Sequence, residues 1–190
     1  LKSTHDSGGI VICKDKSSLD FEAAKAKLSV SLKRDYSKIA REWAYQNVPR
    51  RIIAEEYISE LGKDDLLDYK MYSFHGEPKL TVVCSNRFSK TGTRMNFYDI
   101  NWKPMGIHFG HYPPLPTEFP KPATYEEMKR LTAELSKDCP FLRVDFYEIK
   151  GRLFIGELTF FPGAGFEKFR PMSKDYELGE WLHLETVHRG

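Results

Sequence analysis

The N-terminal third of the chain combines short apolar runs with two helical patterns. Residues 9–13 (GIVIC) follow a loop rich in serine and glycine, and they predict a short buried strand. Apolar residues three or four positions apart predict a helix over residues 20–34, with its apolar face on Phe21, Ala24, Leu28 and Leu32. A second helical stretch surrounds residues 39–44. Residues 51–58 (RIIAEEYI) are rich in β-branched and aromatic side chains and predict a strand.

From Asp68 onward the pattern changes to a period of two. The side chains of residues 68–74 alternate between two sets, as on the two faces of a strand. His75-Gly76 then turns the chain into residues 79–84, which predicts a β-hairpin. Residues 95–100 predict a further strand. Residues 103–122 are rich in proline and have no periodicity, so we expect a long loop there.

The C-terminal half begins with the clearest helical pattern in the chain. Thr124 and Glu127 have the spacing of a capping box, which predicts a helix that ends before Pro140. Two strands, at 141–149 and 152–160, are expected to follow and to be joined by a Lys-Gly turn. With no internal repeats, this order of elements predicts an α+β fold.

Composition excludes several classes of protein. The chain has 190 residues and a net charge of +2, which is too small to favour nucleic acid or a membrane surface as the main partner. No apolar run reaches the roughly 20 residues that span a bilayer. Cys13, Cys84 and Cys139 are few and far apart, so we expect free thiols in a cytoplasmic protein. The chain begins at Leu1, close to the first candidate motif, so we expect an N-terminal piece to be missing.

The last predicted hairpin carries the strongest candidate chemistry. Arg143 and Asp145 share one face of its first strand, and Glu157 and Thr159 share a face of the second. Counted from the turn, Asp145 and Glu157 lie opposite each other within one residue. Adjacent carboxylates repel unless a cation separates them, and oxygen ligands suit Mg²⁺. Alternatively, both are solvent-facing strand residues, and Arg143 neutralises one of them.

Two weaker candidates lie in the N-terminal third. The loop from Lys2 to Gly9 contains small residues that let backbone N–H groups approach phosphate, although it lacks the Walker spacing. An ordinary Ser/Gly loop is the alternative. Consecutive acids at Glu55 and Glu56 interrupt an apolar strand, so one of them must face inward, toward a ligand; on an edge strand both are ordinary outer positions.

In this order, these features resemble the ATP-grasp fold and, more closely, the TupA-like ATP-grasp family. The matching stretches span nearly the whole chain: LKSTHDSGGIVICKDKS, RIIAEEYI, LLDYKMYSFHGEPKL, NFYDINW and FLRVDFYEIKGRLFIGELTFFPGAGFEKF. The resemblance implies two α+β lobes with the nucleotide cleft between them. It places the small lobe at residues 1–57 and the larger lobe at 58–190, and it implies that a preceding N-terminal domain is missing.

The resemblance also implies a role for each matching position. Lys2 would contact the nucleotide phosphates, and the turn containing Ser7 and Gly8 would form the phosphate loop. Adenine would be received by a hinge segment, here Glu55, Glu56 and Ile58. Asp68 would bind ribose.

At the last hairpin the resemblance implies that Asp145 and Glu157 hold Mg²⁺. Arg143 would stabilise the charge of the reacting intermediates and, with Lys2, is a candidate catalytic residue. Many ATP-grasp enzymes have Glu-x-Asn where this chain has Glu157-Leu158-Thr159. Thr159 would therefore replace the asparagine as a metal ligand.

The function implied by the resemblance is ATP-dependent carboxylate–amine ligation through an acyl phosphate, with ATP and Mg²⁺ as cofactors. The family association suggests a role in bacterial cell-surface polysaccharide or peptide-polymer synthesis, with a glycan or peptide precursor as carboxylate donor or amine acceptor. Three alternatives stay open. They are a non-catalytic nucleotide- or glycan-binding remnant, an ATP-grasp kinase, and an α+β domain with accidental motifs.

Overall fold

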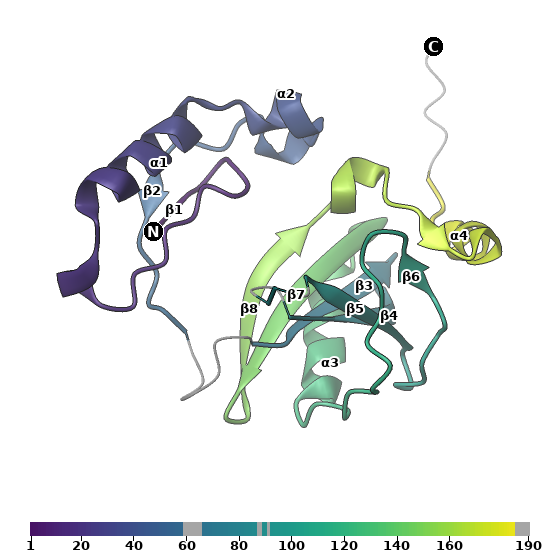
Figure 1. Cartoon of the computed structure of the whole chain (residues 1–190). Helices are drawn as coiled ribbons and strands as arrows, with labels where there is room; N and C mark the ends of the chain where they lie inside the picture. The colour runs from purple at the N-terminus through teal and green to yellow at the C-terminus, as the bar shows by residue number, and fades with distance from the viewer. Residues whose placement is uncertain (59–65, 87–88, 91, 185–190) are drawn as a thin grey trace, which may run out of the picture. The chain divides into compact units, whose positions relative to one another are not determined.

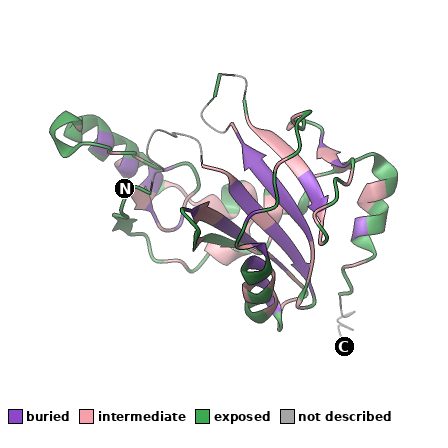
Figure 2. Cartoon of the chain, turned by 90° about the horizontal axis from the view of Figure 1, so that it is seen from below, coloured by how far each residue is buried: buried purple, intermediate pink, exposed green. Residues whose placement is uncertain are grey.

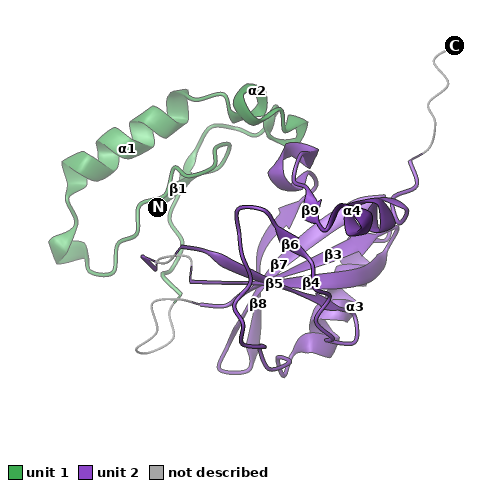
Figure 3. Cartoon of the chain, turned by 45° about the vertical axis from the view of Figure 1, so that its right-hand side comes forward, with its two compact units in different colours: residues 1–58 green, residues 59–190 purple. Residues whose placement is uncertain are grey.

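The computed structural model describes residues 1–58, 66–86, 89, 90 and 92–184, and it confirms a mixed α+β fold with 28% helix and 29% strand. The chain divides into two compact units, Leu1–Ile58 and Ser59–Gly190 (Figure 3). No described helix is both long enough and apolar enough to cross a membrane.

Unit 1 is built around one helix. Asp20 caps α1 (Phe21–Lys33) by accepting a hydrogen bond from the Ala23 amide at 2.9 Å, so the first predicted helix is confirmed (Figure 1). The remaining elements are short: β1 (Lys2–Ser3), η1 (Lys16–Ser18), α2 (Tyr36–Ala40), η2 (Trp43–Tyr45) and β2 (Ile52–Ile53).

Both strands predicted in this unit are wrong in extent. Residues 9–13 contribute a single bridge, from Ile10 to Lys2, and residues 51–58 contribute only the two residues of β2, which pairs with β1. Ile10 and Ile12 are each 49% exposed. The apolar runs therefore have the composition of buried strands, but the two-stranded sheet of this unit does not cover them.

Unit 2 is an antiparallel five-stranded sheet in the order β5-β4-β3-β7-β8. Its strands are β3 (Asp68–Phe74), β4 (Glu77–Ser85), β5 (Arg94–Asp99), β7 (Phe141–Ile149) and β8 (Arg152–Thr159). The two predicted hairpins are confirmed. At each turn, His75-Gly76 and Lys150-Gly151, both residues have positive φ, as a two-residue hairpin loop requires.

The period of two divides this sheet into two packed faces. On one face α3 (Tyr125–Ser136) covers apolar side chains that include Met71, Val144 and Phe146, all fully buried (Figure 2). On the other face Tyr72, Val82 and their neighbours pack with β6 (His108–Phe109), β9 (Phe169–Arg170) and α4 (Met172–Gly179).

Two details of the sequence prediction are corrected in this unit. Thr124 precedes α3 without forming a capping box, because its amide and hydroxyl groups both donate to Glu148 on β7, at 2.8 and 2.5 Å. The proline-rich segment 103–122 is tied to the sheet and contains β6; Asn96, for example, exchanges two hydrogen bonds with the backbone of Leu115.

Candidate nucleotide and metal site

The candidate site lies on three adjacent strands of unit 2. Lys70 on β3 is paired with Asp145 on β7, and Asp145 is paired in turn with Glu157 on β8. Arg143 is opposite Thr159 in the same ladder. The prediction that the two carboxylate residues of the hairpin lie opposite each other is therefore confirmed.

A β-bulge sets which β8 side chains reach this face. The register shifts between Asp145 and Phe146, and Gly156 has no partner on β7. The extra residue places Glu157 on the face of Asp145, whereas Phe154 lies opposite Tyr147. A Cβ on Gly156 would lie 2.7 Å from Cε2 of Tyr147, so the absence of a side chain permits this close approach.

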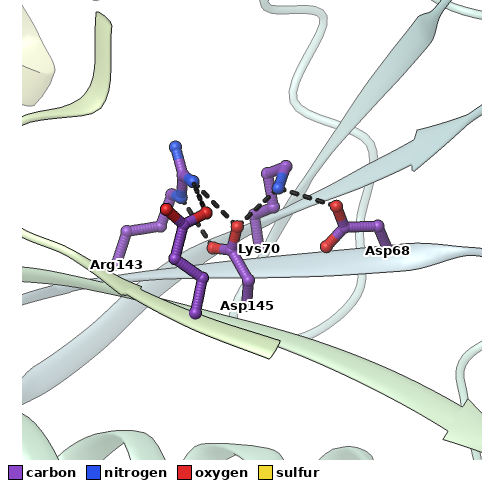
Figure 4. Close-up of polar contacts among 5 residues, drawn as sticks. Asp68, Lys70, Arg143 and Asp145 are labelled. Atoms are coloured by element: carbon purple, nitrogen blue, oxygen red, sulfur yellow. Dashed lines mark hydrogen bonds and ion pairs between the residues drawn. The ribbon is translucent and has the colours of Figure 1, made fainter. Parts of the chain in front are cut away.

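Five charged side chains form a continuous chain of ion pairs (Figure 4). The Lys70 Nζ atom donates to Asp68 Oδ2 at 2.8 Å and to Asp145 Oδ2 at 2.5 Å. Arg143 donates to both oxygens of Asp145, from Nε at 2.6 Å and from a terminal nitrogen at 2.8 Å. A terminal nitrogen of Arg143 also lies 3.5 Å from Glu157 Oε2. We call Asp68, Lys70, Arg143, Asp145 and Glu157 the charged cluster.

Most of the charged cluster is buried. Asp68 and Asp145 are 1% and 3% exposed, whereas the side chain of Glu157 is 51% exposed. Burial alone would lower the pKa of Lys70, but Asp145 and Asp68 outweigh it and raise that pKa above its ordinary value. Burial likewise opposes the charge of Arg143, yet Asp145 raises its pKa above the ordinary value, so both cations stay charged.

Three carboxylates and two cations leave the charged cluster with one net negative charge. Arg143 and Lys70 are thus the cations beside Asp145. Their positive charge offsets the repulsion between adjacent carboxylates that the sequence leads us to expect. The alternative that Asp145 is solvent-facing is wrong, although Arg143 does neutralise it as that alternative supposed. Sequence reasoning missed Lys70, even though the spacing Asp68-x-Lys70 on a strand puts both side chains on one face.

The oxygen atoms at this hairpin are of the chemical types that bind Mg²⁺ in proteins. Glu157 supplies an exposed carboxylate, and the Thr159 hydroxyl is buried without a hydrogen-bond partner among the described residues. Asp145 adds a second carboxylate, both oxygens of which already accept hydrogen bonds from Arg143 and Lys70. Mg²⁺ is commonly held by one or two carboxylates together with waters and substrate phosphates. Within the described part of the chain no group of three His, Cys, Asp or Glu side chains could hold a metal ion.

Unit 1 brings together two other predicted nucleotide contacts. Lys2 Nζ lies 2.8 Å from Glu55 Oε2, and these side chains are 36% and 59% exposed. Glu56 and Ile58 are exposed in a segment without secondary structure, so the hinge predicted there does not rest on a strand. Asp68, the predicted ribose ligand, belongs to the charged cluster of unit 2 and is almost fully buried.

The predicted phosphate loop is anchored to α1 by its polar side chains. Ser31 on α1 donates to Asp6 at 2.5 Å and also hydrogen-bonds the Ser3 hydroxyl at 2.5 Å. A Cβ on Gly9 would lie only 2.1 Å from Ser31 Oγ, so the loop can approach the helix this closely only with glycine there. Ser7 and Gly8 at the tip are exposed, which leaves their backbone accessible to a ligand.

An antiparallel sheet with a buried cluster of carboxylates and cations on one face defines a candidate site for a charged substrate. The family model for TupA-like ATP-grasp proteins matches residues 1–183, and the chain belongs to this family. Membership indicates an ATP-dependent enzyme. Comparison with curated proteins and with solved structures gave no match.

Proposed function

We propose that the protein is an ATP-dependent carboxylate–amine ligase whose reaction passes through an acyl phosphate. The observation that carries the proposal is the charged cluster, because its two cations are held in place by carboxylates beside the exposed Glu157. Family membership supports the use of ATP. In this reaction the substrate carboxylate attacks the γ-phosphate, and an amine then displaces phosphate to give an amide.

Arg143 is the group best suited to stabilise developing charge in the reaction. Its bidentate contact with Asp145 fixes the guanidinium plane, so little reorganisation is needed when negative charge develops on a phosphoryl or tetrahedral group. Lys70 is a positioning residue in this scheme. It donates to Asp145 Oδ2, which Arg143 also contacts, and connects Asp145 to Asp68.

Magnesium would be held by Asp145, Glu157 and Thr159, and when bound it would offset the charge of the ATP phosphates. Glu157 is the most accessible of these groups and therefore the first carboxylate available to a Mg-nucleotide. The Thr159 hydroxyl is free to coordinate the ion or to hold one of its waters. These side chains also supply the oxygen-rich surroundings in which a phosphate-bound metal keeps its remaining waters.

In unit 1 we assign the phosphate contacts to Lys2 and to the Ser7 and Gly8 backbone, and the adenine contacts to the segment from Glu55 to Ile58. Lys2 is paired with Glu55, so nucleotide binding would exchange this partner for phosphate oxygens. Asp68 retains the ribose assignment. A polymer of the cell surface is the substrate class that the family association suggests.

The first test is calorimetric titration of the chain with a non-hydrolysable ATP analogue, with and without Mg²⁺. We expect saturable binding that strengthens with Mg²⁺ and that loses this enhancement in Glu157→Gln. Glu134→Gln is the matched control, since Glu134 is an exposed carboxylate on α3 outside the charged cluster. Equal Mg²⁺ enhancement in both variants would contradict the metal assignment.

Trapping with hydroxylamine then separates ligation from kinase activity. An acyl phosphate reacts with hydroxylamine to give a hydroxamate, whereas a phosphorylated hydroxyl group does not. Candidate carboxylates incubated with the chain, ATP and Mg²⁺ should yield a hydroxamate that depends on Glu157. ATP consumption with a phosphorylated hydroxyl product would instead identify a kinase.

A further inference from the structure

Tyr72 lies next to Arg143 and has no part in the chemistry assigned so far. The two residues are direct partners in the ladder between β3 and β7, so their side chains leave the same face of the sheet side by side. The Tyr72 hydroxyl accepts a hydrogen bond from the Arg143 guanidinium, which carries only donors. Arg143 therefore has an oxygen partner in addition to the carboxylates of Asp145 and Glu157.

The ring of Tyr72 is held by aromatic side chains on this face of the sheet. Tyr72 is 4% exposed, and its ring packs edge to face against Phe141 and Phe169, with centroids 5.7 and 6.5 Å apart. Phe169 packs in turn against Phe97 and Phe109, at 5.9 and 5.1 Å. A ring enclosed by other rings has little freedom to move, so the packed core fixes the position of the hydroxyl group.

The described oxygen partners of Arg143 differ in accessibility. Asp145 accepts from Nε and from a terminal nitrogen, whereas Glu157 lies 3.5 Å from a terminal nitrogen and its side chain is 51% exposed. Glu157 is also the carboxylate that we propose meets the Mg-nucleotide first, so it does not serve Arg143 alone. Asp145 and Tyr72 are both buried and are the partners that hold the guanidinium on the sheet.

The pair formed by Arg143 and Asp145 is held from β3 at both ends. Two parallel hydrogen bonds fix the guanidinium in the plane of the carboxylate, but the pair can still tilt as a unit about its side-chain bonds. Lys70 restrains the Asp145 end, because it is the ladder partner of Asp145 and donates to it at 2.5 Å. Tyr72, two residues further along β3, restrains the Arg143 end in the same way.

A phenol can anchor a guanidinium without neutralising it. Burial raises the pKa of Tyr72 above its ordinary value, although Arg143 acts in the opposite direction, so the hydroxyl stays protonated and neutral at neutral pH. Asp145, by contrast, compensates the charge of Arg143. A further carboxylate in place of Tyr72 would weaken the attraction of Arg143 for a phosphoryl or tetrahedral anion.

We propose that Tyr72 is a positioning residue for Arg143, whose guanidinium it fixes in the orientation that stabilises negative charge during phosphoryl and acyl transfer. This inference rests on the proposed function, because it requires that Arg143 acts in the reaction. It adds a residue that contacts neither the nucleotide nor the metal and that acts through Arg143.

The test compares Tyr72→Phe with Tyr98→Phe in steady-state ATP hydrolysis by the full chain with Mg²⁺. Tyr98 is the matched control, since it is a buried phenol on the α3 side of the same sheet and accepts a hydrogen bond from the Phe119 amide. We expect Tyr72→Phe to lower kcat by about tenfold to a hundredfold, with KM for ATP within about twofold of the unchanged chain. Tyr98→Phe should keep its kcat. Equal kcat in the two variants, or a loss in Tyr72→Phe confined to KM, would overturn the proposal.

NMR of the arginine side chains separates this proposal from the proposed function. The Nε–Hε signal of Arg143 is assigned by its loss in Arg143→Lys, and it should shift in Tyr72→Phe but not in Tyr98→Phe. An unmoved signal in Tyr72→Phe would show that Tyr72 does not hold Arg143, even if the unchanged chain turns over ATP. A shift in a chain that never turns over ATP would confirm the contact but overturn its catalytic role together with the proposed function.

Discussion

The two units hold their polar groups in place by different means. In unit 2 the charged cluster lies on β3, β7 and the edge strand β8 of a five-stranded sheet, and α3 packs against the opposite face of β3 and β7. In unit 1 the loop from Ser3 to Gly9 is held by side-chain hydrogen bonds to α1 and by hydrogen bonds between Thr4 and Arg51. A sheet therefore fixes side chains through its strand register, whereas the loop depends on a few hydrogen bonds. A single side-chain substitution removes most of these bonds.

The largest expected effect is the loss of turnover when the carboxylates of the charged cluster are changed. Asp145→Asn and Glu157→Gln should each reduce ATP turnover by roughly a hundredfold or more, as removal of a catalytic electrostatic contact typically does. Only Asp145→Asn should also lower the free energy of unfolding, by about 3 kcal/mol, because it removes the buried carboxylate that Arg143 and Lys70 share and leaves them only Glu157 and Asp68 respectively.

Steady-state ATP hydrolysis and urea unfolding of both variants measure these effects, with Asp138→Asn as an exposed control. Normal turnover in either cluster variant would show that its carboxylate is not needed for chemistry. Equal stability of the two would show that the burial of Asp145 does not matter energetically.

A smaller effect is expected at the bulge that aligns β8 with β7. Gly156→Ala places a methyl group 2.7 Å from the Tyr147 ring, so we expect a destabilisation of about 1–3 kcal/mol, typical of overpacking. Turnover should also fall if the ring displaces the bulge, because Glu157 is the next residue along the strand. The double variant Gly156→Ala/Tyr147→Ala should regain part of the lost activity. Unchanged stability and turnover in Gly156→Ala would show that the bulge does not position the site.

The stability of the chain at high pH tests whether Lys70, a buried cation of unit 2, is paired with Asp68 and Asp145 as described. The pKa of Lys70 is raised in the folded chain above its ordinary value of 10.5, so its stabilising contribution is complete below that value and is lost as the pH rises through the folded pKa. Burial raises the pKa of Tyr72, which also makes stability fall above about pH 10.

Urea unfolding between pH 9 and 11.5 should therefore show a decline that is shallower in Lys70→Met and in Tyr72→Phe than in the unchanged chain. Lys70→Met should be less stable at neutral pH, because Asp68 and Asp145 lose their shared partner. An unchanged slope in both variants would exclude these two groups as its source.

Sequence reasoning predicted unit 2 better than unit 1, and the reason is physical. In unit 2 a period of two and Lys-Gly or His-Gly turns fix the register, so the opposition of Asp145 and Glu157 followed from counting back from Gly151. The bulge at Gly156 was not predicted, since it depends on how closely the Tyr147 ring approaches the strand. Lys70 was missed because a strand lysine is ordinarily exposed.

Among the described residues of unit 1, the two-residue strands β1 and β2 form the only sheet, so its apolar runs do not extend into longer strands. Ile10, Ile12 and Ile52 have the side chains of buried strands but remain exposed at 45–49%. Local propensity alone therefore overestimated the strands there. The anchoring of Asp6 and Ser3 to Ser31 joins residues 25 and 28 positions apart, a separation that carries no local signal in the sequence.

The smallest effect on stability is expected from the exposed ion pair of unit 1. Lys2→Gln removes the contact with Glu55, but both side chains are at least 36% exposed, so we expect a loss of less than about 1 kcal/mol in the free energy of unfolding. If Lys2 contacts phosphate, the same variant should weaken binding of the ATP analogue by about tenfold. Glu55→Gln breaks the same ion pair but keeps the ammonium group, so it is the matched control. Weakening confined to Lys2→Gln would assign the ammonium to the nucleotide, whereas equal weakening in both variants would assign the effect to the ion pair itself.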